Sequence, residues 1–148
     1  MFGRNRYSER GANLVEFAML APFLILLLVG VVEFSWTLAT NLDVKQGARE
    51  GARLTAVNFP DTGNAGLAAE ICSRMDLIGS QPSTTITWES DDGTPDVGEG
   101  VTVTVSTAHN TLTGLLDFFF SGLATLDSSV EIRIEKPADW IDGTESCP

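Results

Sequence analysis

The residue least expected from its surroundings is Glu16, whose carboxylate lies at the edge of a long apolar run. That run, residues 17–32, contains no charge. A charge in a membrane helix costs on the order of 2 to 3 kcal/mol on insertion scales, so Glu16 needs a partner that offsets this cost. If the chain were cut between Gly11 and Ala12, the new amino group would lie about one helical turn from the carboxylate. Because an ion pair is stronger in low dielectric than in water, pairing with an amine is the chemistry that Glu16 predicts.

The element that must position Glu16 is a membrane-spanning helix. At about 1.5 Å per residue, residues 12–32 are long enough to cross a hydrocarbon core of roughly 30 Å. Three arginines precede the span and acidic residues dominate after it, so the amino end should stay cytoplasmic and the remainder should be exported. We expect a disordered leader at residues 1–11 and a helix from about residue 13 to about 57, kinked near Pro22. Membrane lipid is therefore the first partner.

Several features of this helix occur together. A basic leader ends in Gly11, the pair Glu16-Phe17 follows, Pro22 lies inside the aliphatic run, and residues 46–53 form a block of small and charged residues. Together they resemble type IV pilin-like proteins, and more narrowly the TadE-like minor pseudopilins of the tight-adherence (Tad or Flp) pilus machinery. The resemblance covers roughly the first third of the chain.

The resemblance implies a role for each of these residues. Gly11 would admit a membrane prepilin peptidase that cuts before Ala12. Glu16 would then pair with the new amino group of its own or an adjacent subunit, and Phe17 would pack beside it. The implied partners are the peptidase, other pseudopilins and pilin subunits, and a pilus export platform with its cytoplasmic motor. The implied function is assembly of a pilus used in adhesion, as a minor rather than a bulk component.

Length and charge limit the domain organisation and the partners of the rest of the chain. The 148 residues carry a net charge of -11, and the excess of acid lies after Leu42. We expect an α+β protein with a leader at 1–11, a transmembrane helix at 12–42 and one exported acidic head at 43–148. This charge excludes nucleic acid as a partner. An acidic head should stand away from anionic lipid or dock on a basic partner.

The patterns in the head predict one short helix and an antiparallel sheet of about three strands. Apolar spacing predicts a helix over roughly residues 65–78 with Gly79 as its cap. Period-two alternation predicts strands at 84–89, 101–105 and 129–135. The tail at residues 138–148 should be loose apart from Trp140 and a possible bridge at Cys147. After the span, one face of the helix repeats at helical spacing and is expected to pack on the chain's own head. Its residues are Val44, Ala48, Gly51 and Thr55.

The two cysteines, Cys72 and Cys147, lie far apart in the sequence. In an oxidising compartment a bridge between them would stabilise the head by roughly 3 to 5 kcal/mol. A buried free thiol at Cys72 and a mobile one at Cys147 are the equally open alternative, because two lone cysteines define no framework.

No motif in the head predicts catalysis, a cofactor or a metal. The acidic loop at residues 91–100 has oxygen ligands but lacks the spacing of a calcium loop, so a solvated turn is favoured. His109 has no nucleophile pattern around it and is expected at the surface. The phenylalanine-rich segment 112–126 is too short to span a membrane and should fill the core of the head, with a place on a membrane or partner surface as the alternative.

Two other classes of function stay open. One is an uncut, single-span membrane anchor whose head is an adhesion or binding module, with Glu16 merely reaching the cytoplasmic interface. The other is an exported enzyme on a stalk, for which a deep polar pocket would be the first sign. A secretory signal peptide cut after residues 37–39 is disfavoured, because its apolar region would be too long.

Overall fold

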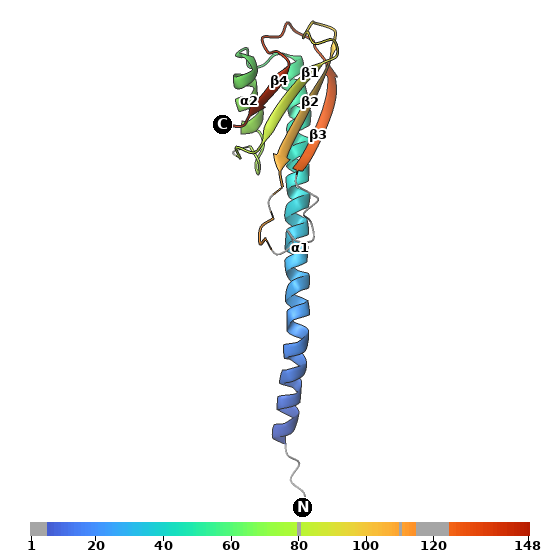
Figure 1. Cartoon of the computed structure of the whole chain (residues 1–148), viewed down its shortest axis with the longest axis vertical. Coiled ribbons are helices and arrows are strands. Elements are labelled where there is room, and N and C mark those ends of the chain that lie inside the picture. The colour runs from blue at the N-terminus through green and yellow to red at the C-terminus, as the bar shows by residue number, and fades with distance from the viewer. Residues whose placement is uncertain (1–5, 80, 110, 115–124) are drawn as a thin grey trace, which may run out of the picture.

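The protein is described by a computed structural model that covers residues 6–79, 81–109, 111–114 and 125–148. One long helix, α1 (Arg6–Ala56), carries a small head at its C-terminal end and projects far beyond it (Figure 1). The head contains a short helix, α2 (Gly63–Ser73), and one antiparallel sheet. Its strands lie in the order β3-β2-β1-β4 and are β1 (Thr85–Ser90), β2 (Gly100–Ala108), β3 (Thr125–Arg133) and β4 (Gly143–Ser146). The predicted α+β class is confirmed, with four strands rather than about three.

The long helix begins earlier than predicted. Because α1 starts at Arg6, the expectation of a disordered leader is wrong for residues 6–11, while residues 1–5 lie outside the described part of the chain. Extending an existing helix adds one hydrogen bond per residue, and a single glycine such as Gly11 costs only about 1 kcal/mol. Pro22 lies inside α1 without ending it. The kink expected there stays a prediction.

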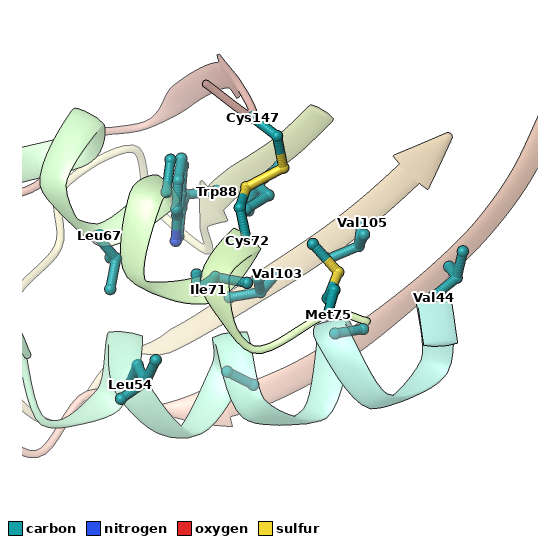
Figure 2. Close-up of a cluster of buried hydrophobic side chains, with 14 of the residues drawn as sticks. Val44, Leu54, Leu67, Ile71, Cys72, Met75, Trp88, Val103, Val105 and Cys147 are labelled. Carbon is teal, nitrogen blue, oxygen red and sulfur yellow. A yellow bond between two sulfur atoms is a disulfide. The ribbon is translucent and has the colours of Figure 1, made fainter. Parts of the chain in front are cut away.

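The last three turns of α1 pack on the head through small residues, as predicted. Val44 and Ala48 are fully buried. A Cβ added to Gly51 would lie 3.3 Å from Ile71 Cδ1 and 3.4 Å from Val103 Cγ1, so glycine allows this close approach. α1 contacts β2 and β3 while α2 lies against α1 and β4, and the core fills the space between the helices and the sheet (Figure 2).

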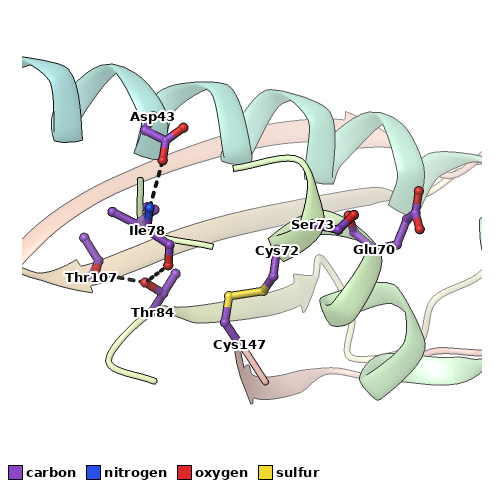
Figure 3. The surroundings of a disulfide bond; sticks show 8 residues. All are labelled: Asp43, Glu70, Cys72, Ser73, Ile78, Thr84, Thr107 and Cys147. Atoms are coloured by element: carbon purple, nitrogen blue, oxygen red, sulfur yellow. Dashed lines mark hydrogen bonds between the residues drawn. A yellow bond between two sulfur atoms is a disulfide. The ribbon is translucent and has the colours of Figure 1, made fainter. Parts of the chain in front are cut away.

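The second helix is shorter than predicted. It ends at Ser73 rather than near residue 78, and Gly79 is not its cap. A Cβ on Gly79 would lie 1.9 Å from the carbonyl oxygen of Cys72, so the chain turns back closely there. The backbone after α2 is held by Asp43 on α1, because a carboxylate replaces the helical carbonyls as acceptor. It accepts the N–H groups of Asp76, Leu77 and Ile78 at 3.2, 2.8 and 3.0 Å, and Figure 3 draws the last of these.

The C-terminal tail is ordered, which corrects the expectation that it is loose. β4 pairs with the outer side of β1, opposite β2. Side-chain amides and carboxylates fix the tail before this strand. The Asn64 side chain bonds both the N–H and the carbonyl of Ile141, and Asp142 accepts from the N–H and hydroxyl of Ser90. These polar anchors leave no hydrophobic periodicity in the sequence, so pattern reading missed them.

A disulfide joins Cys72, in the last turn of α2, to Cys147, directly after β4 (Figure 3). Both residues are buried, and their Cα atoms lie 5.7 Å apart. The Cys147 N–H also donates to the carbonyl of Thr84. The bridge therefore ties the C-terminal strand to the helix layer across the core.

The strands otherwise follow the predicted alternation, with shifted limits. β2 places Val101, Val103 and Val105 in the core and threonine or serine on the other face. β3 begins four residues earlier than predicted, at Thr125. The centre of the segment expected to fill the core, residues 115–124, lies outside the described residues.

We predict that Cys72→Ser with Cys147→Ser lowers the thermal midpoint of the head. The bridge closes a loop with a sequence separation of 75 residues, for which chain entropy predicts roughly 3 to 5 kcal/mol. Thermal unfolding of the full chain in detergent, followed by the fluorescence of buried Trp88 and Trp140, measures the effect. Adding a reductant to the wild type is the matched control and should reproduce it. An unchanged midpoint in both would contradict a stabilising bridge.

Candidate functional site

The predicted processing and pairing residues lie on the free part of α1. Gly11 has no atom within 4 Å of the position that a Cβ would take, so nothing in the described fold covers it. Glu16 is exposed, and within the described part of the chain no hydrogen bond or ion pair to it is found. Phe17 beside it is 65% exposed. The helix alone brings Gly11, Ala12, Glu16 and Phe17 together within two turns, and Pro22 follows Phe17 by one to two turns.

This helix is long and apolar enough to cross a membrane, and its most apolar stretch is not covered by the head. The other predicted pair, Cys72 and Cys147, lies in the head and takes no part in this region. Whatever covers residues 11–32 in the cell therefore comes from outside the described chain. Lipid and other apolar helices are the two materials that can cover these apolar side chains and keep them from water.

A second carboxylate on α1, Glu33, forms a site that sequence reasoning missed. Its side chain is only 3% exposed. It accepts the backbone N–H of Leu112 at 3.0 Å and that of Thr113 at 2.6 Å, and the Thr113 hydroxyl donates to the same carboxylate. The segment after β2 is thereby held against α1 well below the sheet. The available signal was the cost of a charge at the end of an apolar run, which demands a partner without naming it.

His109 lies next to this contact and is half-buried against α1, which corrects the expectation of a surface histidine. The Thr37 hydroxyl donates to the carbonyl of Glu33 at 3.0 Å, so its oxygen accepts from His109 Nε2 at 3.2 Å. That assignment puts the proton on Nε2 and leaves Nδ1 buried without a partner among the described residues. His109 is the first residue after β2, which ends at Ala108, and its contact with Thr37 brings the end of this strand to α1.

Farther along α1, Glu50 connects the two helices. It forms ion pairs with Arg53 on its own helix and with Arg74 at the end of α2, and Arg74 also pairs with Glu70. The hydrogen bond from Arg53, reinforced by the two positive charges, holds the pKa of Glu50 below its usual value. This network fixes α2 on α1 but leaves no free acid or base for chemistry.

The remaining polar features of the head do not assemble a reactive site. Across the described ranges, no three histidine, cysteine or acidic side chains are grouped to hold a metal. In the acidic loop, the hydrogen bond with Asp92 raises the pKa of Glu99. A hollow of about 840 Å³ at the end of the head far from the free helix is lined by three cations, but Asp61 and Asp139 oppose them and no nucleophile with a base lines it.

We predict that Glu33→Ala releases the segment at Leu112 and Thr113 while the head stays folded. Removing the carboxylate takes the acceptor from two backbone N–H groups, whereas the core and the disulfide are untouched. Hydrogen exchange at these two amides should accelerate, with amides of β1 unchanged. Glu33→Gln, which keeps one acceptor oxygen, is the matched control and should show a smaller change. Equal protection in wild type and Glu33→Ala would show that Glu33 does not hold the segment.

The comparisons with known proteins bear on the same helix. Residues 11–53 match the family described as TadE-like protein. The matched range begins at Gly11 and includes Glu16, Pro22, Glu33 and the small residues that pack on the head. No curated protein and no solved structure matches the chain. Over residues 11–53 of its N-terminal helix, the chain is therefore similar to TadE-like proteins.

Proposed function

We propose that this chain is a minor pilin-like subunit required for assembly of a Tad-type pilus. The observation that carries the proposal is the TadE-like match over residues 11–53, on a helix whose apolar half projects free of the head. A helix of this composition needs an apolar environment, which the membrane supplies before assembly and neighbouring helices supply after it. The head, held together by its own core and disulfide, needs neither.

The proposed sequence of events follows the layout of α1. The amino end stays in the cytoplasm, residues 12–42 span the inner membrane and the acidic head is exported. A prepilin peptidase cuts between Gly11 and Ala12, leaving Glu16 as the fifth residue of the mature chain. The new amino group, of this chain or of a neighbour, then pairs with Glu16 and fixes the register of the packed helices. Other pseudopilins, pilin subunits and the export platform are the proposed partners, and surface attachment is the proposed use.

One observation favours the rival function, an uncut membrane anchor that presents its head. α1 runs unbroken from Arg6 through the Gly11–Ala12 bond, so a peptidase must open the helix there. Gly11 is the weakest point for such opening, because glycine in a helix costs about 1 kcal/mol relative to alanine. The two functions therefore differ in one measurable property, the mature amino terminus.

We predict that the protein purified from membranes of cells with an active peptidase lacks residues 1–11. Intact mass and amino-terminal sequencing measure this directly. Gly11→Leu should keep the leader, since the side chain meets nothing in the fold and can disturb only recognition by the peptidase. Gly30→Leu is the matched control: it is also an open glycine of α1, and cleavage should proceed. An intact leader in the wild type would establish the uncut anchor.

We predict that Glu16→Leu is inserted and cut normally but does not assemble. Removing the charge eases insertion by about 2 kcal/mol, while the amino group loses its partner. Glu16→Asp keeps the charge and should retain part of the activity. Membrane content, cleavage and pilus number by electron microscopy separate the steps. Normal pilus number in Glu16→Leu would rule out the pairing role while leaving cleavage and membership of the pilus untouched.

A further inference from the structure

The proposed span at residues 12–42 contains, besides Glu16, one charged residue, Glu33, whose surroundings decide how deep the head sits. Sequence alone ends the uncharged run at Val32, because Glu33 follows. In the structure Glu33 is 3% exposed, and its carboxylate is bonded to the backbone of Leu112 and Thr113. A carboxylate that is hydrogen-bonded and covered by protein does not meet the lipid as a bare charge. The position of Glu33 along α1 therefore does not mark the boundary between the membrane and water.

The exposed surface of α1 stays free of charge well beyond Glu33. On α1 the exposed charges that bracket this surface are Glu16 on one side and Lys45 on the other. Between them, residues 17–42 rise about 39 Å along the helix axis, which is about 9 Å more than a hydrocarbon core of roughly 30 Å. The additional stretch is apolar where it is exposed: Phe34, Leu38 and Leu42 are 71%, 50% and 58% exposed.

The head presents an apolar side chain at the same level. Leu112 is 53% exposed, and its backbone is bonded to Glu33. In Figure 1 the chain beyond β2 descends beside α1, below the sheet and toward the free end of the helix. Trp36 is half-buried at the same level of α1, on the side of the helix away from Phe34 and Leu38. Tryptophan is enriched at membrane interfaces, where one end of the ring is apolar and the other is hydrated.

We propose that the base of the head is a lipid-binding surface, formed by Phe34, Trp36, Leu38, Leu42 and Leu112, which rests in the outer interface of the membrane. The Glu33 contact permits this depth, because it withdraws the carboxylate from the lipid. The inference rests on the membrane insertion in the proposed function, but not on cleavage or pilus assembly.

Lipid is the occupant that the geometry favours over a second helix. The surface continues the apolar span without a break, and the exposed or half-exposed polar side chains added to it, Ser35, Thr37 and Asn41, are uncharged. A length of about 39 Å matches a bilayer of about 40 to 45 Å including its headgroup regions. A packed helix would need no such match, so its presence is an alternative result of the test.

The test uses Trp36 as a natural depth probe. The full chain is reconstituted in phosphatidylcholine vesicles with and without lipids brominated on the acyl chain, and tryptophan fluorescence is recorded. Trp88 and Trp140 are each 1% exposed inside the head and serve as an unquenched reference. We expect brominated lipid to remove the Trp36 emission in the wild type, and to remove nothing in the control Trp36→Phe. Quenching that persists when vesicles carry few protein copies supports lipid contact.

Three results would overturn the inference. If the Trp36 emission is equal with and without brominated lipid, Trp36 lies outside the membrane. Quenching that appears only in Glu33→Gln would show that the charge of Glu33 sets the depth after all. If Trp36 is protected from brominated lipid at high protein density and quenched on dilution, a second copy of the helix covers it. A chain that fails to enter the vesicles, seen by flotation, would instead refute the membrane insertion on which the proposed function also depends.

Discussion

One helix has to satisfy two environments, and the rest of the structure follows from how it does so. Toward the amino end, α1 presents apolar side chains on all sides, as a lipid-facing helix does. Toward the carboxyl end, it presents small residues to one side only and packs closely on the sheet and α2. The change occurs within about two to three turns, between Glu33 and Asp43. In those turns the helix changes from a bare apolar rod to an element that packs on its own head.

The partners of the carboxylates on α1 differ along the helix in the same way. Glu16 is exposed on the bare helix, Glu33 binds the backbone after β2, Asp43 binds the backbone after α2, and Glu50 pairs with arginines. In the two middle cases a carboxylate accepts amide protons from a loop that has no secondary structure of its own. Charged hydrogen bonds of this kind are stronger than neutral ones, and they satisfy backbone donors that would otherwise be buried without a partner. The loops are shaped by the helix rather than by their own sequence.

Sequence patterns predicted the parts of the molecule that depend on repeated residue types. The apolar run, the small face at Val44, Ala48 and Gly51, and the alternating valines of β2 each carry a period that fixes one face of an element. The limits that failed depend on single long-range bonds. α2 stops early because Asp43, 34 positions before Leu77, captures the amides that follow the helix, and β4 forms because Asn64 and a disulfide hold the tail. No local window contains both partners of such a bond.

The same long-range bonds decide how the head is coupled to the long apolar helix. Glu33, Asp43 and Glu50 attach α1 to three different parts of the head over 17 residues, or about 25 Å of helix. Attachment at three levels prevents the head from turning about the axis of α1 or sliding along it. A movement of α1 along its axis therefore moves the head by the same amount and in a fixed orientation. The residues of α1 before Glu33 make no contact with the described head, and this is the part of the chain where Glu16 stands without a partner among the described residues.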